Sequence, residues 1–286
     1  MECEVESHIA QMDAVRVENH ICQTKYPILM VHGVFFRDWQ LFNYWGRVPK
    51  ELMINGARVY YGKQESALAI ESSGRELCTQ IEQILEETGA ERLNIIAHSK
   101  GGLDSRYAIS MCGMADKIAS LTTINTPHLG CKWADILLDK LPPTLVNGVA
   151  KNYNRMFKRL GDAEPDFLGA VKDLTEQRLR EFNHEVPDMP GVLYQSVMSK
   201  MNSPKSAGFP LNVTYRIINK LQREENDGLV PISSAKWGNY LGDVTVKGRR
   251  GISHGDMIDL FRENIDGFEV RNFYVDLIKD LKSKGY

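Results

Sequence analysis

The chain has 286 residues, of which 43% are hydrophobic and 25% are charged, and this composition is typical of a globular protein rather than a disordered one. Its 35 basic residues against 37 acidic ones give a net charge of -2, so we expect no nucleic-acid partner. No apolar run approaches the ~20 residues that cross a bilayer, and we therefore expect no transmembrane segment.

The N-terminal segment MECEVESHIAQMDAVRVENH lacks the basic region and the apolar region of a signal peptide. The five cysteines are odd in number and have no CxxC spacing, which indicates free thiols and a reducing compartment. They are Cys3, Cys22, Cys78, Cys112 and Cys131. We therefore expect a cytoplasmic protein, or a secreted one if a leader precedes this sequence.

Short apolar runs alternate with helical patterns along the chain. The expected strands are Tyr26–Val31, Ala57–Tyr61, Arg92–Ala97, Ile118–Ile124, Gly191–Val197 and Val213–Ile218. The expected helices are one over Leu77–Leu85 that stops at Gly89, one after Gly102 and one over Asn264–Lys282. This alternation predicts a single α/β domain over residues 1–286, with a mostly parallel sheet and helices on both faces.

Residues 131–190 interrupt this alternation, because they contain helical patterns but no convincing strand. An amphipathic helix is expected there. Its apolar stripe is Leu145, Val149, Tyr153, Met156, Phe157 and Leu160, and the opposite face carries Lys151, Arg155, Lys158 and Arg159. The pattern fits an ordinary surface helix as well as a mobile lid, but its position as an insertion near the candidate nucleophile favours a lid.

The strongest local motif is Ala97-His98-Ser99-Lys100-Gly101, between an expected strand and an expected helix. A serine on such a sharp strand-to-helix turn is raised above the sheet edge, and the turn admits only small residues two positions before and after it. Alanine stands at the first small position, where glycine is more frequent. We therefore predict that Ser99 is a nucleophile.

Two backbone N–H groups are the expected oxyanion-hole donors. One is that of Lys100, at the start of the helix, and the other is that of Val34, in the loop after the first strand. Only the backbone of Lys100 is needed, so its side chain is expected to be solvated. His32 precedes Ser99 in the sequence and is expected to brace the Val34 loop rather than to act as a base.

A serine hydroxyl needs a histidine to take its proton and an acid to orient that histidine. Three histidines follow Ser99: His128, His184 and His254. His254 lies in a loop before a helix and leaves room for an acid earlier in the chain, so it is the expected base. His128, with Leu129, is expected to line the substrate site, whereas His184 falls in the helical insertion.

Asp227 is the expected acid, because the turn Glu225-Asn226-Asp227-Gly228 follows the expected late strand Val213–Ile218. Asp-Gly is also a common turn pair, so Asp227 could be a turn former only. The rival acids are Glu224, Glu225 and Asp243.

Taken together, these motifs resemble those of the bacterial true lipases of the Pseudomonas, Burkholderia and staphylococcal groups, which have the α/β-hydrolase fold. The matching segments are YPILMVHG (Tyr26–Gly33), HSKGG (His98–Gly102) with Arg106-Tyr107, TPHLG (Thr126–Gly130), NDGLV (Asn226–Val230) and His254-Gly255-Asp256. The resemblance implies the same triad, Ser99, Asp227 and His254, and the same oxyanion donors, Val34 and Lys100.

Several of these lipases hold calcium near the catalytic histidine, and Asp256 occupies the position of one of its ligands. The second expected aspartate is missing, because no aspartate occurs between Asp188 and Asp227. The paired histidines of the zinc-binding relatives are also missing. We therefore expect neither a metal nor a cofactor.

The sequence thus predicts a serine carboxylic ester hydrolase, specifically a lipase that cleaves acylglycerols at a lipid–water interface through an acyl-enzyme on Ser99. The basic amphipathic helix would meet the lipid surface. A small-ester esterase, a phospholipase or an acyltransferase with the same triad is the alternative. An inactive hydrolase fold that serves as a binding protein is the alternative from another class.

Overall fold

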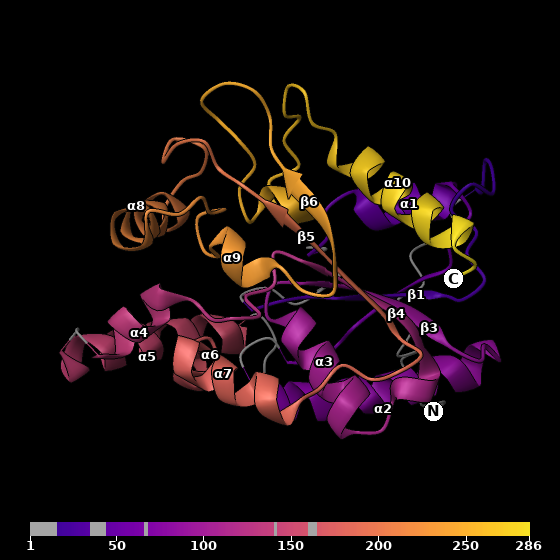
Figure 1. Cartoon of the computed structure of the whole chain (residues 1–286), viewed down its shortest axis with the longest axis horizontal. Coiled ribbons are helices and arrows are strands. Elements are labelled where there is room, and N and C mark those ends of the chain that lie inside the picture. Colours follow the sequence, from indigo (N-terminus) through magenta and orange to yellow (C-terminus); the bar gives the residue numbers. More distant parts are fainter. Residues whose placement is uncertain (1–15, 35–43, 66–67, 140–141, 160–164) are drawn as a thin grey trace, which may run out of the picture.

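A computed structural model of the chain describes residues 16–34, 44–65, 68–139, 142–159 and 165–286. A central sheet lies between two layers of helices (Figure 1). The α/β class expected from the sequence is therefore confirmed.

The sheet has six strands in the order β2-β1-β3-β4-β5-β6, and each neighbouring pair is parallel. The strands are β1 (Ile28–Val31), β2 (Val59–Tyr61), β3 (Leu93–His98), β4 (Ile118–Ile124), β5 (Leu193–Ser199) and β6 (Asn239–Val244). Because all strands run the same way, the loops that follow their carboxyl ends meet at one edge of the sheet.

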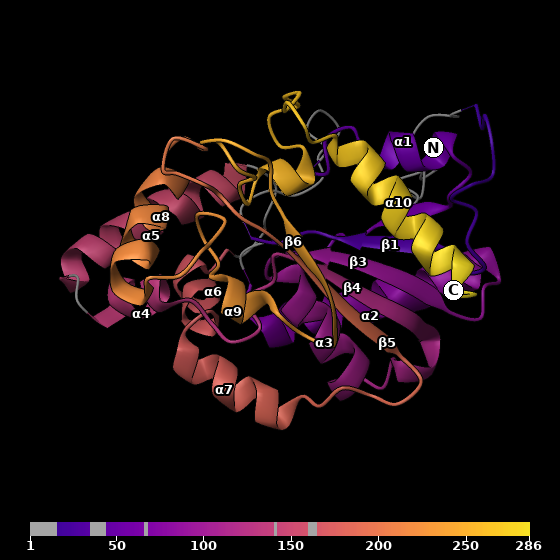
Figure 2. The ribbon, with the colours of Figure 1, turned by 45° about the horizontal axis from the view of Figure 1, so that its top comes forward.

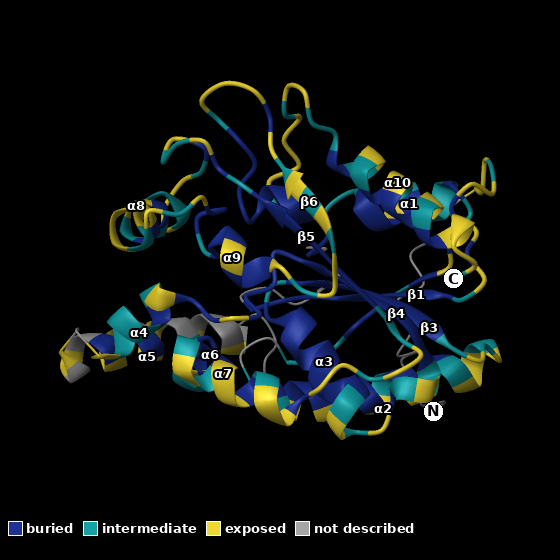
Figure 3. Cartoon of the chain, viewed as in Figure 1, coloured by how far each residue is buried: buried dark blue, intermediate teal, exposed yellow. Residues whose placement is uncertain are grey.

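Alternate residues of each central strand enter different cores. Ile28 and Met30 of β1 pack in one apolar cluster, whereas Leu29 and Val31 pack in another. Strand side chains point alternately to the two faces of a sheet, so a strand covered on both sides is apolar throughout. Figure 3 shows the central strands buried along their length, with exposed residues on the outer helices, the loops and the edge strand β6.

Helices cover both faces of the sheet (Figure 2). On one face lie α1 (Val48–Ile54) and α10 (Val270–Ser283), and on the other lie α2 (Ile70–Thr88) and α3 (Gly101–Met111). Helix α2 ends, as expected, at Gly89, whose left-handed backbone (φ 64°) caps it. Short 3-10 helices cover Ala115–Lys117 and Asp256–Ile258.

Helices alone are found in the described part of the 131–190 segment, and no strand lies there, as expected. They are α4 (Lys132–Asp139), α5 (Pro143–Arg159), α6 (Phe167–Asp173) and α7 (Glu176–Glu185). Leu160, the last residue of the expected apolar stripe, lies outside the described residues. No helix in the described ranges is long and apolar enough to cross a membrane.

One expectation about the C-terminal third was wrong, and one strand there was missed. Residues 213–218 lie in helix α8 (Leu211–Gln222) and not in a strand. The buried residues of α8, Tyr215 and Ile218, are three positions apart, which is the spacing of one helix face. The last strand is instead β6, whose sequence NYLGDV contains residues that are rare in strands and whose residues are exposed or half-buried. A short helix, α9 (Ile232–Ala235), lies between α8 and β6.

The side chain of Lys100 was expected in solvent, and this was wrong as well. Its side chain is only 1% exposed, and its ammonium group lies 2.6 Å from the carboxylate of Asp104. It also donates a hydrogen bond of 3.2 Å to the Ser73 hydroxyl on α2. Burial raises the pKa of Asp104 to about 7, although Lys100 acts to lower it. The pair therefore connects the start of α3 to α2. The connection requires two charged groups to be buried.

Removing one charge of this pair should lower the free energy of unfolding more than removing both. We expect Lys100→Met to lower the free energy of unfolding by about 3 kcal/mol, because it leaves Asp104 without its cation, and Lys100→Met/Asp104→Leu to recover most of that loss. Urea unfolding of the wild type, the single variant and the double variant measures this.

The loss should also depend on pH. Without Lys100 the folded protein keeps a proton on Asp104 that the unfolded chain releases above the ordinary pKa of 3.8. The wild-type carboxyl, with its pKa of about 7, ionises by pH 8, whereas the carboxyl of Lys100→Met, without its cation, should stay protonated to higher pH. The stability of Lys100→Met relative to the wild type should therefore fall further above pH 7, and the double variant should not share this slope. A double variant that is less stable than the single one would contradict this account of the pair.

Candidate active site

Ser99 occupies the tight turn between β3 and α3. Its backbone is left-handed, with φ 55°, a conformation that is rare for residues other than glycine and is often found at functional sites. Its N–H donates to the carbonyl of Ile124 at 2.9 Å, and its carbonyl accepts from the Thr126 hydroxyl at 2.7 Å. The end of β4 and the loop after it therefore hold the strained turn in place.

The loop after β1 lies directly against this turn. A Cβ atom at Gly101 would lie 2.4 Å from the carbonyl oxygen of His32, and one at Gly33 would lie 2.7 Å from the Cβ of Ser99. Neither position can hold a side chain without moving the backbone of the other segment. This is the steric restriction that the sequence motif predicts, and it places Gly33, the residue before Val34, against Ser99.

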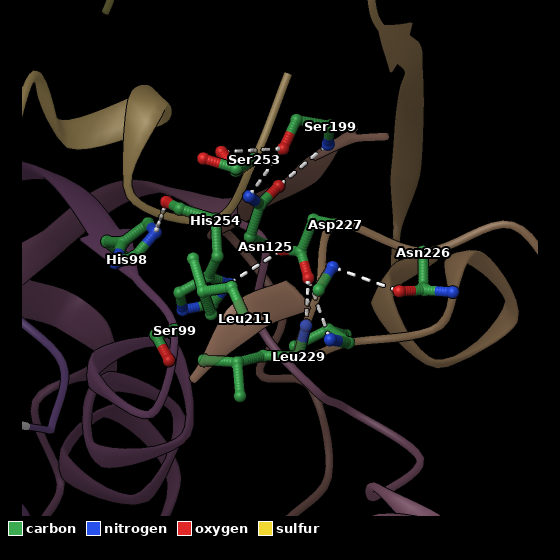
Figure 4. A network of polar contacts seen from close by, with 12 residues as sticks. His98, Ser99, Asn125, Ser199, Leu211, Asn226, Asp227, Leu229, Ser253 and His254 are labelled. Atoms are coloured by element: carbon green, nitrogen blue, oxygen red, sulfur yellow. Dashed lines mark hydrogen bonds and ion pairs between the residues drawn. The ribbon is translucent and has the colours of Figure 1, made fainter. Parts of the chain in front are cut away.

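Asp227 and His254 form a buried pair. The Nδ1 atom of His254 lies 2.6 Å from Oδ2 of Asp227, and the other carboxylate oxygen accepts the N–H groups of Leu229 at 2.8 Å and Val230 at 2.7 Å. The backbone N–H of His254 donates to the Asp227 carbonyl at 2.9 Å. Figure 4 shows the His254 ring between Asp227 and Ser99. The structure thus brings the three expected triad residues together at one edge of the sheet.

The rival acids are engaged elsewhere. Glu224 accepts the N–H and the hydroxyl of Ser233, Glu225 pairs with Lys200 at 2.9 Å, and Asp243 bonds to the Tyr240 hydroxyl.

Two other histidines, His184 and His32, have different surroundings. His184 is exposed on α7. His32 is fully buried, with its Nδ1 3.0 Å from the carbonyl of Gly33, where it supports the loop after β1 as the sequence predicts.

His128 and Leu129 differ in their access to solvent. The His128 residue has no exposed surface, its Nε2 lies 3.0 Å from the Thr123 hydroxyl, and its ring stacks on Trp237 at 5.1 Å. Contact between this ring and a substrate would therefore require a rearrangement. Leu129 is 47% exposed, so it can meet a ligand directly.

The loop that carries His254 is held by an ion pair. The Arg250 guanidinium lies 2.9 Å and 3.2 Å from the two carboxylate oxygens of Asp256, and Asp256 also accepts the N–H of Ser253 at 2.8 Å. The carboxylate expected at a calcium position is thus already neutralised by a guanidinium. These residues do not fit a calcium ion, and no cluster of three metal-ligating side chains occurs in the described ranges.

Sequence analysis missed two residues next to the pair, Tyr44 and His98. The His98 ring lies 4.5 Å from the His254 ring, and the Tyr44 hydroxyl lies 2.6 Å from Nδ1 of His98. Burial holds the pKa of His98 well below its usual value of 6.5, and the neighbouring His254 lowers it further. His98 stands in the serine motif itself, but nothing in the local sequence marks Tyr44.

The chain is similar to known ester hydrolases. Residues 28–151 match the protein family described as "Putative serine esterase (DUF676)". A triacylglycerol lipase from Vibrio cholerae is 31% identical over 243 residues, which cover 77% of this chain and 77% of that one. A triacylglycerol lipase from Pseudomonas fragi is 27% identical over 92% of this chain and 98% of its own length.

Solved structures give the same fold. The crystal structure of the mature form of a Bacillus licheniformis lipase matches with a TM-score of 0.65 and 19% identity, over 89% of this chain and 92% of that one. The fold is therefore that of the α/β-hydrolases, as the motifs indicated. With the identity to the Vibrio cholerae enzyme over three quarters of both chains, the chain belongs to the triacylglycerol lipase family of serine ester hydrolases.

Proposed function

We propose that this protein hydrolyses acylglycerol esters, with Ser99 as nucleophile, His254 as base and Asp227 as acid. The observation that carries the proposal is the 2.6 Å contact between His254 and Asp227 beside a serine with a left-handed backbone. An acid that bonds to Nδ1 leaves Nε2 of the same ring free to take the serine proton.

The reaction follows from these positions. Ser99 attacks the ester carbonyl while His254 takes its proton, and Asp227 stabilises the imidazolium that forms. The N–H groups of Val34 and Lys100 bind the developing oxyanion, the second of them at the N-terminus of α3. His254 then protonates the leaving alcohol, and water attacks the acyl-enzyme by the same route.

The Asp227 carboxylate is held in place by its own turn, because two backbone N–H groups donate to one of its oxygens. Its side chain is fully buried, so a cation on His254 would be stabilised in a site that water screens poorly.

The acylglycerol substrate is proposed from two observations. The relatives named above are triacylglycerol lipases, and Leu129, Phe209 and Phe261 are large exposed apolar residues. Leu129 lies in the loop after β4 and Phe261 lies seven positions after His254. Exposed apolar side chains in the loops that follow the sheet's carboxyl edge suit acyl chains better than a small polar ester.

We also propose that the helical insertion contains a lid, and that its movable part is α5. Helices α6 and α7 bury Phe167, Val171 and Phe182 in a cluster with α3, to which the described side chains of α5 add the small Ala150. The larger contribution places α6 and α7 in the body of the domain. On α5, the polar residues Lys151, Arg155 and Lys158 are exposed. These cations would meet anionic head groups at a lipid surface.

A reducing, cytoplasmic setting is the matching proposal for location. Cys22, Cys78, Cys112 and Cys131 are free thiols, and Cys22 and Cys131 are buried, with pKa values raised by burial. Thiols of this kind persist where glutathione keeps cysteines reduced.

The triad predicts a large loss on substitution of Ser99. Ser99→Ala and Asp227→Asn should each lower kcat on p-nitrophenyl esters by roughly 10⁴-fold, because the base then lacks a nucleophile or an orienting acid. Ser110→Ala, at the far end of α3, is the matched control and should keep wild-type activity. Wild-type activity in Ser99→Ala would exclude this nucleophile.

The same assay separates lipase from esterase. Esters from two to sixteen carbons should be hydrolysed with a long-chain preference in the wild type. A short-chain optimum would retain the chemistry and favour the small-ester esterase.

The Arg250–Asp256 pair predicts that calcium is not needed. Prolonged treatment with EDTA should leave activity unchanged, whereas Arg250→Gln should lower kcat roughly tenfold by loosening the loop that holds His254. Arg271→Gln is a matched control, since the side chains of Arg250 and Arg271 are both 32% exposed and both bind a carboxylate. Inactivation by EDTA that calcium reverses would show that the protein needs calcium and would contradict this prediction.

The exposed cations of α5 predict a lipid-dependent effect. Replacing Lys151, Arg155 and Lys158 by glutamate should weaken binding to anionic vesicles at least about 100-fold, since each cation near such a surface contributes about 1 kcal/mol. Hydrolysis of soluble p-nitrophenyl butyrate should be unchanged. The same charge reversal at the C-terminal end of α10, at Lys279, Lys282 and the following Lys284, is the control. Equal losses in both triple variants would argue against a surface role for α5.

A further inference from the structure

Three hydrogen bonds connect the loop after β1 to the loop that carries His254. The N–H of Gly33 lies 3.1 Å from the Tyr44 hydroxyl, which lies 2.6 Å from Nδ1 of His98. The opposite nitrogen of the same ring, Nε2, lies 3.2 Å from the backbone carbonyl of His254. The Tyr44 and His98 side chains thus join both loops to the strand that leads into Ser99.

The chemistry of the two ends fixes every proton in this chain of bonds. A carbonyl oxygen only accepts, so the Nε2 atom that faces His254 must carry a hydrogen. A backbone N–H only donates, so the Tyr44 hydroxyl accepts from Gly33, and its own hydrogen can be donated to Nδ1 of His98 at 2.6 Å. That bond requires a bare Nδ1. The low pKa of the buried His98 agrees with this assignment, because the ring is then neutral at physiological pH.

We propose that Tyr44 and His98 are positioning residues that hold the oxyanion loop and the main chain of His254 in fixed places around Ser99. The proposal rests on the function proposed above, in which the residue after Gly33 donates an N–H to the oxyanion. Neither side chain is required to touch the substrate, and each acts through the backbone group that it binds.

Tight packing holds the Tyr44 and His98 side chains, here called the brace, in place. Tyr44 is 3% exposed and His98 is 1% exposed, and their rings meet edge to face at 5.8 Å. A Cβ on Gly33 would lie 2.7 Å from Ser99 and 3.1 Å from the Tyr44 hydroxyl. The Tyr44 hydroxyl therefore contacts the loop at the point where that loop approaches Ser99. Removal of the hydroxyl should displace the loop at this point.

Tyr44→Phe tests the oxyanion end of the brace, because it removes one oxygen and keeps the ring. We expect kcat on p-nitrophenyl butyrate to fall roughly tenfold with KM within about twofold, since the oxyanion forms only in the transition state. The labelling rate of Ser99 by a fluorophosphonate should fall in parallel.

Tyr194→Phe is the matched control. Tyr194 is 9% exposed, and its hydroxyl also accepts a backbone N–H, that of Met189, at 3.0 Å. It lies near the start of β5, at the opposite end of that strand from the site. Both variants should lower Tm by similar amounts, but only Tyr44→Phe should lower kcat. Equal kcat values in the two variants would overturn the proposal.

Two substitutions of His98 separate the two arms of the brace, which are the hydrogen bond to Tyr44 and the hydrogen bond to the His254 carbonyl. The amide of His98→Asn can stand in for Nδ1 and keep the Tyr44 bond, while that of His98→Gln can stand in for Nε2 and keep the His254 bond. If each arm positions one part of the site, each variant should retain more activity than His98→Ala, which keeps neither. Activity in His98→Ala equal to that of the wild type would overturn the proposal.

Nitrogen NMR of histidine-labelled protein provides a readout that needs no turnover. The proposal requires His98 as the Nε2–H tautomer in the wild type, with ring signals that move in Tyr44→Phe and stay in place in Tyr194→Phe. A His98 ring that carries its hydrogen on Nδ1 would refute the brace.

The two proposals can fail separately. If Ser99 is neither labelled nor required for hydrolysis, the proposed function fails, and the NMR result alone judges the brace. If Ser99 is labelled and required while Tyr44→Phe retains wild-type kcat, only the brace fails.

Discussion

The left-handed backbone of Ser99 is the constraint on which the rest of the site depends. Such a conformation costs on the order of 1–3 kcal/mol and persists only where its surroundings enforce it. Here the carbonyl of Ile124 and the hydroxyl of Thr126 bind the two backbone groups of Ser99. The turn is also so tight that the loop after β1 touches it through backbone atoms. The nucleophile and the proposed oxyanion loop are therefore one packed unit, and neither can shift without the other.

The acid and the base reach this unit from the other half of the sheet, and hydrogen bonds rather than apolar packing set their positions. The amide of Asn125, just after β4, exchanges two bonds of 2.8 Å with Ser199 at the end of β5. The backbone of His254 binds that of Asp227. A parallel sheet places all these loops at one edge, and the polar bonds between them define the distances within that edge.

Features that depend on neighbouring residues in the sequence could be predicted, whereas contacts between residues far apart in the sequence could not. The central strands and the Ser99 turn depend on local patterns, which is why the apolar runs and the small residues around the serine located them correctly. Residues 213–218 misled because β-branched residues in a short run fit a strand as well as a helix. Strand β6 lies at a sheet edge, where little burial is needed and the apolar signal is weak. The contact between Tyr44 and His98 spans 54 positions, and no local pattern marks a contact of that kind.

The acid also limits how a lid can move. The indole N–H of Trp133, at the start of α4, donates to the carbonyl of Leu229 at 2.8 Å, and the N–H of Leu229 binds the Asp227 carboxylate. A displacement of the whole insertion would therefore pull on the turn that orients His254. Since α6 and α7 are packed against α3, an opening that preserves the Asp227–His254 pair has to pivot after Trp133 and before α6. Helix α5 lies between those two anchors, so the lid proposed above would have to move through α5 and to free Ala150, which packs in the same cluster as α6 and α7.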